Sequence, residues 1–259
     1  MKYDALNDYK IYLGETGLRP QTVRTYYNRM DNLLNGQNPF HILENLDIDK
    51  ILDNLAKIKY KNHFSQSKNA FLYFLKLNQI TLSDKQLSQI KQLEQATKKK
   101  YRRLKEREFH KIKNSINHLK NPKLKLSYQT LLETGLRVSE ISQIRSKDTT
   151  ITEDEIQFSF IGKGGDLEYT NILYQDNPKL FNQLKGHIKN TKPKDKLFYS
   201  SSYLQEKSRD LCFSCHDLRR ACAKLAYKKT KSKTKVQEKL RHAKAKTTNI
   251  YLKSKIKMK

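Results

Sequence analysis

The sequence predicts a mainly α-helical protein with a small antiparallel β element, divided into two domains. Over most of the chain, apolar residues recur every three or four positions, the spacing that forms one face of an α-helix. Residues 155–174 instead alternate apolar and polar side chains around a glycine-rich turn, which is typical of a β-hairpin. A basic tract without apolar periodicity, residues 98–104, predicts a linker between domains at residues 1–97 and 105–259.

Amphipathic segments of the N-terminal domain predict a small helical bundle. Gly14 and Gly17 are expected to end the first helix, and Asn35 with Gly36 the second. The expected helices span residues 3–13, 19–34, 47–55, 60–77 and 83–93. In the C-terminal domain the same periodicity predicts helices at residues 106–116, 125–134 and 139–144.

The charge of the chain indicates a polyanionic partner. Its 53 Lys and Arg residues outnumber 26 Asp and Glu, a formal net charge of +27 that solubility alone does not require. A membrane surface is also polyanionic, but the longest apolar run, residues 70–75, is too short to span a bilayer, so we expect no membrane anchor.

The N-terminus lacks the apolar core of a secretory signal, and three cysteines are an odd, small number for a disulfide framework. A cytoplasmic location fits best.

Two short motifs suggest a nucleotide or metal site and are better explained otherwise. Gly162-Lys163-Gly164 resembles part of a phosphate-binding loop, but the required spacing before Gly-Lys and the following Ser or Thr are missing. Cys212 and Cys215, next to His216, have the spacing of a zinc or redox pair, but no second pair accompanies them. We favour structural or incidental thiols and expect neither a metal nor a cofactor.

The last third of the chain carries residues suited to chemistry on a phosphodiester. His216 and Arg219 lie three apart on one helical turn, His242 follows, and Tyr251 comes nine residues later. These side chains supply cations, proton carriers and a nucleophile. A tyrosine phenol has a pKa of about 10, so it attacks a phosphate only with a base or strong electrostatic help nearby. His216, Arg219 and His242 are candidates for that help.

The order and spacing of five boxes resemble the tyrosine recombinase (phage integrase) family. The boxes are Thr134-Gly135-Leu136-Arg137-x-x-Glu140, Gly162-Lys163-Gly164, His216-x-Leu218-Arg219, Leu240-x-His242 and Tyr251. The resemblance covers the chain from about Tyr101 onward and implies a tyrosine recombinase catalytic domain. Before it, Leu18-Arg19-Pro20-Gln21-Thr22-x-x-x-Tyr26 stands where that family has a helical, SAM-like core-binding domain.

The resemblance implies a covalent mechanism of DNA cleavage. Tyr251 would attack a DNA phosphate, forming a 3′-phosphotyrosyl link and releasing a 5′-hydroxyl. His216 would assist proton transfer at the tyrosine, and Lys163, on the hairpin, would protonate the leaving oxygen. Because one ester is exchanged for another, no metal or nucleotide is needed.

The same resemblance assigns the residues that hold the phosphate. Arg137 and Arg219 would bind the non-bridging oxygens, and His242 would donate a further hydrogen bond. Glu140 would support the region around Arg137.

Further cations are expected to contact DNA. Arg241 replaces the glycine usual in the family before the second histidine, and Arg220 stands where histidine is frequent. Asp166 and Glu168 follow the hairpin turn where basic residues are common, which predicts different hairpin contacts. The DNA-binding residues expected are Arg19, Thr22, Lys98, Lys99, Lys100, Arg102, Arg103, Arg220 and Arg241.

The favoured function is a site-specific recombinase that acts on double-stranded DNA with short core sites. It would assemble as a tetramer on two sites, exchange strands through a Holliday junction and lack an arm-binding domain. A type IB topoisomerase-like enzyme and a non-catalytic DNA-binding protein on the same fold are the alternatives. Residues filling all six catalytic positions favour an enzyme. A short tail, residues 252–259, is expected either to couple neighbouring copies weakly or to be a solvated terminus.

Overall fold

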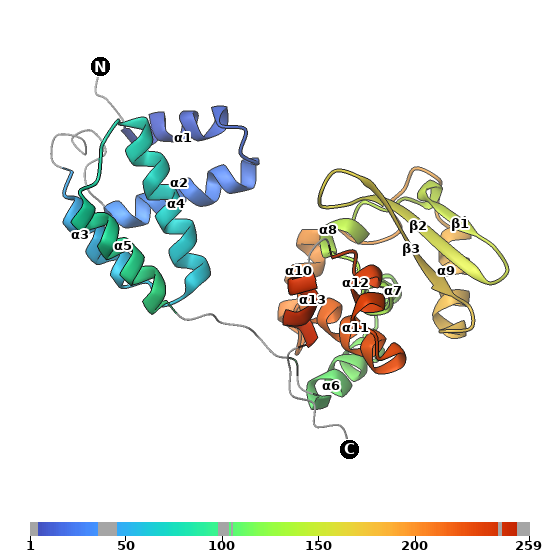
Figure 1. The fold of residues 1–259 in the computed structure, drawn as a ribbon. Coiled ribbons are helices and arrows are strands. Elements are labelled where there is room, and N and C mark those ends of the chain that lie inside the picture. Colours follow the sequence, from blue (N-terminus) through green and yellow to red (C-terminus); the bar gives the residue numbers. More distant parts are fainter. Residues whose placement is uncertain (1–4, 36–45, 98–103, 105, 243–244, 253–259) are drawn as a thin grey trace. The chain divides into compact units, whose positions relative to one another are not determined.

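The protein is described by a computed structural model that covers residues 5–35, 46–97, 104, 106–242 and 245–252 (Figure 1). The chain forms two compact units, Met1–Tyr101 and Arg102–Lys259. Each unit has its own cluster of buried apolar residues. Apart from Leu104, the predicted linker lies outside the described residues, as does the tail beyond Leu252.

The first unit is a helical bundle, as the sequence predicts. Its helices are α1 (Ala5–Glu15), α2 (Pro20–Leu34), α3 (Ile48–Ala56), α4 (Lys61–Leu77) and α5 (Asp84–Ala96). A capping box between Ser83 and Gln86 begins α5, and Asn35, in the left-handed conformation, ends α2. Tyr9 lies fully buried in the centre and donates a hydrogen bond to the carbonyl of Ala70 at 2.8 Å.

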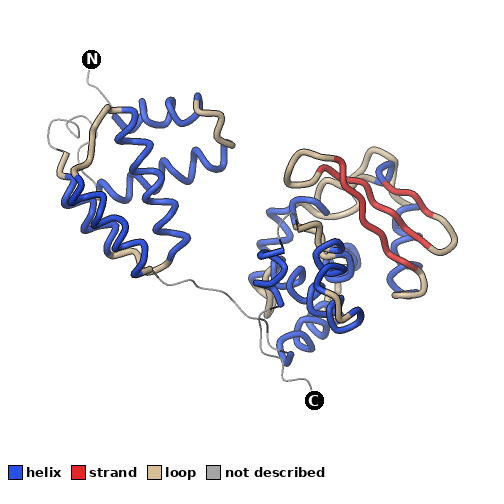
Figure 2. Tube along the Cα trace, in the orientation of Figure 1, coloured by secondary structure: helices blue, strands red, loops and turns tan. Residues whose placement is uncertain are grey.

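The second unit combines helices with an antiparallel sheet (Figure 2). Its helices are α6 (Glu106–Asn117), α7 (Pro122–Thr134), α8 (Val138–Ile141), α9 (Pro178–Lys189), α10 (Ser201–Arg209), α11 (Cys215–Thr230), α12 (Lys233–Lys239) and α13 (Ala245–Leu252), with a 3₁₀ turn η1 (Ser146–Asp148). The strands are β1 (Thr149–Ile151), β2 (Glu155–Ile161) and β3 (Leu167–Leu173), in the order β1-β2-β3.

The predicted hairpin is confirmed, whereas other elements differ from the expectation. β2 and β3 pair from Glu155↔Leu173 to Ile161↔Leu167 around the glycine turn. β1 was not predicted, because a strand of three residues shows no alternation. The helix predicted at residues 139–144 is wrong at its end, since α8 stops at Ile141 and its C-cap, Ser142, gives way to a turn.

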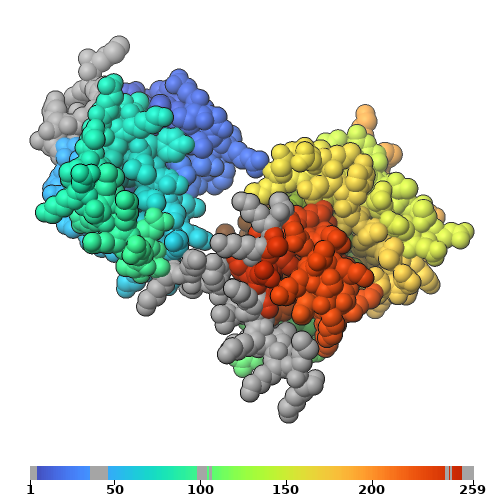
Figure 3. Space-filling view, viewed as in Figure 1, coloured from blue at the N-terminus to red at the C-terminus, as the bar shows by residue number. Residues whose placement is uncertain are grey.

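The core of the second unit lies between α7, α11 and the sheet. Tyr128 of α7 is fully buried, and its hydroxyl donates to the carbonyl of Leu204 at 2.8 Å. Helix α9 covers the sheet, with Phe181 edge-on to Tyr174 at 5.4 Å between ring centroids. The C-terminal helices pack around a smaller cluster that includes Cys222, and they lie beside the β2–β3 hairpin on the surface (Figure 3).

Candidate active site

Arg219 is the buried centre of the site. It projects from α11 with 1% exposure, and its guanidinium donates to the carbonyls of Gly135 and Leu240. Those two carbonyls lie at the ends of α7 and α12, so one side chain ties both helix ends to α11. Burial, and then the positive charge of Arg137, lower the pKa of Arg219 to about 10, which leaves it protonated at neutral pH.

Gly135 makes this convergence possible. Its φ of +66° is left-handed, the conformation that ends α7. A Cβ at this position would lie 2.6 Å from Cδ2 of Leu240 and 3.0 Å from the sulfur of Cys222. The glycine therefore allows both the left-handed turn at the end of α7 and the close approach of α11 and α12 to that end.

Glu140 places a buried negative charge among the arginines of the site. Its side chain is 2% exposed, pairs with the Arg137 guanidinium and accepts the Arg137 backbone N–H at 2.7 Å. The Glu140 carboxylate also lies 3.9 Å from Arg219 and 3.7 Å from Arg241. Arg137 stays 28% exposed, so its guanidinium is within reach of a ligand. One buried carboxylate thus holds a cluster of arginines together.

Tyr251 and His216 form the contact that bears most directly on chemistry. The phenol oxygen lies 2.9 Å from Nε2 of His216, in a hydrogen bond, and the rings are edge-on. The His216 side chain is exposed at one edge, and desolvation of its ring, followed by the charges of Arg220 and Arg219, lowers its pKa to about 4. The imidazole is therefore neutral at pH 7, and Nε2 can accept the phenol proton.

His242 also packs against the tyrosine ring. Its ring centroid is 5.1 Å from that of Tyr251, and its Nδ1 is 2.9 Å from the hydroxyl of Thr248. His242 is 6% exposed, and burial, followed by the charge of Arg219, lowers its pKa to about 4. Sequence reasoning missed Thr248, whose position three residues before Tyr251 on α13 was the available signal.

Arg220, predicted to contact DNA, lies against the Tyr251 ring. Its guanidinium donates to Asp217 at 2.8 Å and sits 5.9 Å from the centroid of the Tyr251 ring. The fully buried Asp217 also accepts the N–H and hydroxyl of Ser214 and so fixes the start of α11. Asp217 was likewise missed, because its partners become visible only in three dimensions.

Lys163 occupies a different part of the unit from the other predicted catalytic residues. It lies exposed on the turn between β2 and β3, which is closed by a hydrogen bond from Gly162 N–H to the carbonyl of Asp166 at 2.8 Å. The other five predicted catalytic residues, together with Glu140, lie close together where α8, α11 and α13 meet.

The other predicted DNA contacts are distributed as follows. Arg19 is exposed at the N-cap of α2 in the first unit, and Thr22 follows in the first turn of that helix. Lys98, Lys99, Lys100, Arg102 and Arg103 lie outside the described residues. Arg241 is only 14% exposed and pairs with acidic groups, so its contact with DNA stays a prediction and its geometry favours an internal role.

The cysteines contact different groups. Cys212 lies 3.3 Å from the hydroxyl of Ser115, whereas the buried thiol of Cys215 faces the carbonyl of Leu204 at 3.5 Å. Over the described ranges, no three His, Cys, Asp or Glu side chains come together as metal ligands would. Nor does any described helix have the length and apolar character to cross a bilayer.

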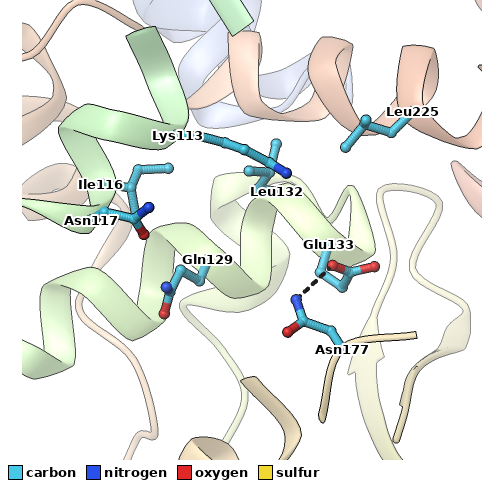
Figure 4. A pocket seen from close by; sticks show the side chains of 8 residues that line it. All are labelled: Lys113, Ile116, Asn117, Gln129, Leu132, Glu133, Asn177 and Leu225. Atoms are coloured by element: carbon cyan, nitrogen blue, oxygen red, sulfur yellow. Dashed lines mark hydrogen bonds between the residues drawn. The ribbon is translucent and has the colours of Figure 1, made fainter. Parts of the chain in front are cut away.

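A pocket of about 200 Å³ lies apart from this site, between α6 and α7 (Figure 4). Asn177 donates to Glu133 at 3.1 Å on one wall, and Lys113 lies on another. None of the predicted catalytic residues lines it. Three of the catalytic candidates, Arg137, His216 and Tyr251, instead reach the surface above the buried Arg219, which suits a polymer substrate better than a pocket does.

Comparison with known proteins assigns the chain to a protein family. Residues 102–258 match the phage integrase family, and the chain belongs to that family. Tyrosine recombinase XerA of Saccharolobus solfataricus is 31% identical over 147 residues, which cover 54% of this chain and 49% of XerA. The match thus spans about half the length of that relative.

Solved structures share the fold. A lambda integrase dimer bound to a COC′ core site aligns with a TM-score of 0.70 at 18% identity, over 98% of this chain and 96% of that one. The pre-cleavage complex of the XerH recombinase with its difH substrate aligns with a TM-score of 0.61 at 19% identity, over 88% and 74%. The chain therefore shares the fold of these recombinases.

Proposed function

We propose that this protein is a site-specific recombinase that cleaves and rejoins double-stranded DNA through a 3′-phosphotyrosyl intermediate. The observation that carries the proposal is the hydrogen bond of 2.9 Å between the Tyr251 phenol and Nε2 of His216. It supplies a nucleophile with its proton acceptor, beside a cluster of arginines, in a chain of the phage integrase family.

The first step of this mechanism is attack by the phenol oxygen on phosphorus. Neutral His216 takes the phenol proton through Nε2 as the new P–O bond forms. A free phenolate is far more basic than this imidazole, so the proton leaves together with the attack. Arg220, over the Tyr251 ring, favours the negative charge that builds on the phenol oxygen.

Charge on the phosphate is balanced by the arginine cluster. Arg137, which stays partly exposed, binds one non-bridging oxygen, and Arg219 uses N–H groups other than those bonded to carbonyls. His242, oriented by Thr248, donates a third hydrogen bond. Donors fixed in advance favour the transition state, because they need no reorganisation when charge develops.

The leaving 5′ oxygen needs a proton, which we assign to Lys163. Its ammonium stands on the exposed hairpin turn, so it reaches the scissile phosphate when the hairpin meets bound DNA. The bond between phosphorus and the 5′ oxygen breaks, the phosphotyrosyl bond remains, and a second 5′-hydroxyl reverses the step on a new partner. No external energy source is consumed.

The first unit serves as the core-binding domain in this proposal. Arg19 and Thr22 contact DNA there, and we assign further DNA contacts to Lys98, Lys99, Lys100, Arg102 and Arg103. A net charge of +27 supports such an interface. Assembly as a tetramer on two sites is supported by a lambda integrase tetramer on a Holliday junction, which aligns with a TM-score of 0.67 at 18% identity. A cytoplasmic location belongs to this proposal.

Covalent capture on genomic DNA tests the proposal. The protein is incubated with fragmented DNA, denatured and recovered, and the attached 3′ ends are sequenced. A recombinase gives a shared core sequence, and plasmids bearing two copies of it exchange strands. Relaxation of supercoiled plasmid without exchange would instead indicate a topoisomerase-like enzyme, and DNA binding without covalent attachment would indicate a non-catalytic protein.

A further inference from the structure

Arg241 occupies a backbone position that disfavours it. Its φ is +51°, and it follows Leu240 at the end of α12, where its N–H bonds to the carbonyl of Glu238 at 2.8 Å. A helix that ends in this left-handed way normally has glycine there, because a Cβ is crowded in that conformation. An arginine at this position therefore implies that its side chain contributes something a glycine would not.

The Arg241 side chain turns inward onto the β2–β3 hairpin. Its Nε lies 3.1 Å from Oε2 of Glu168, an ion-pair distance without the alignment of a hydrogen bond. Its guanidinium carbon is 5.2 Å from the centroid of the Phe160 ring. Phe160 and Glu168 are direct partners across β2 and β3, so Arg241 contacts both strands of the hairpin at one register position.

Glu168 connects this contact to the turn that carries Lys163. A Cβ at Gly162 would lie 2.2 Å from Oε1 of Glu168, so the carboxylate rests directly on the glycine that precedes Lys163. The other end of the Arg241 guanidinium lies 3.7 Å from Glu140, the carboxylate that pairs with Arg137. A continuous chain of charges thus runs from the hairpin turn to the arginine cluster.

We propose that Arg241 is a positioning residue that holds the β2–β3 hairpin, and with it Lys163, in register with the arginine cluster. The inference rests on the proposed function for its catalytic consequence, but the ion pair itself acts in the protein without DNA. Losing the pair frees the hairpin, so Lys163 spends less time in reach of the leaving oxygen, while Tyr251 and its neighbours keep their contacts.

The first test needs no DNA. Amide hydrogen exchange is measured on the full chain for Arg241→Gly, Glu168→Gln and the double variant, with Glu155→Gln, at the far end of β2, as the matched control. We expect exchange of the Gly162 amide to rise about tenfold in each single variant, with no rise in the double variant beyond that of Arg241→Gly, since both substitutions break the same Arg241–Glu168 ion pair. Arg241→Gly also removes the left-handed crowding, so it should fold. Unchanged exchange in both single variants would overturn the inference.

The second test measures the rate of DNA cleavage. A nicked DNA duplex with the captured core sequence is prepared with oxygen or sulfur as the 5′-bridging atom, and covalent attachment is timed. A sulfur leaving group needs no proton from Lys163. We expect Arg241→Gly and Glu168→Gln to cleave the oxygen substrate about tenfold or more slowly and the sulfur substrate at the wild-type rate.

The two substrates separate the possible failures. Equal slowing on both would mean that the variants damage the site generally, and wild-type rates on both would mean that the pair positions nothing; either result overturns the inference. If the wild-type protein attaches to neither substrate, the proposed function is wrong, and hydrogen exchange still decides whether the pair holds the hairpin.

Discussion

Replacing Gly135 with alanine should destabilise the second unit far more than an ordinary glycine substitution. The left-handed φ of +66° costs an alanine about 1–2 kcal/mol. The added Cβ would lie 2.6 Å from Cδ2 of Leu240, and overpacking of this kind costs about 1–3 kcal/mol. Together these terms lower the free energy of unfolding by about 2–5 kcal/mol.

The matched control is Gly17→Ala in the first unit. Gly17 has a similar φ of +70° but no atom within 4 Å of the added Cβ, so only the backbone cost of about 1–2 kcal/mol applies. Urea unfolding, followed separately for each unit, gives both numbers. A Gly135→Ala effect no larger than that of Gly17→Ala would refute the packing argument. The packing argument also predicts that Gly135→Ala costs less in a Leu240→Ala background, because removing the contacted methyl relieves part of the strain. Effects of the two substitutions that simply sum in the double variant would refute it.

Three further predictions concern charge. Because the pKa of His242 is about 4 folded and 6.5 unfolded, the unfolded chain binds its proton first as pH falls, and the contribution of His242 to the free energy of unfolding drops by about 3 kcal/mol between pH 6.5 and 4. Urea titrations should show this drop shrinking in His242→Gln. Lys163→Ala should block cleavage of ordinary DNA yet recover with a 5′-bridging sulfur, whereas Arg219→Ala should lose about a hundred- to a thousandfold in cleavage rate on both substrates. The logarithm of the DNA-binding constant should fall with the logarithm of the salt concentration, with a slope of about −0.9 per phosphate contacted. Deleting residues 1–97 should make this slope less steep, and an unchanged slope would exclude the first unit from the DNA interface.

Local patterns predicted much of the fold. Helices with a regular apolar face and the hairpin are visible in the sequence, because their periodicity is set by neighbours a few residues away. The three residues of β1 are too few to show a pattern. Helices α9 and α10 were not assigned, although Asn177 and Ser200 before them are ordinary N-caps.

The residues of the candidate site could be named from spaced motifs, but their contacts could not. The Tyr251–His216 hydrogen bond joins positions 35 residues apart, and the Arg219–Gly135 bond joins positions 84 apart. Arg241 shows the limit most clearly. The charge of Arg241 suggested a contact with DNA, whereas its burial against Glu168 and Phe160 depends on how α12 packs against the hairpin.

Mapping the covalent attachment to a single residue tests the central claim most directly. Protein trapped on a nicked duplex with the captured sequence is digested with protease and nuclease, and the peptide that carries the remaining nucleotide is sequenced by mass spectrometry. The mechanism predicts a 3′-nucleotide on the phenol oxygen of Tyr251 and none in Tyr251→Phe, which still binds DNA. Attachment at any other of the 15 tyrosines, or its persistence in Tyr251→Phe, would contradict it.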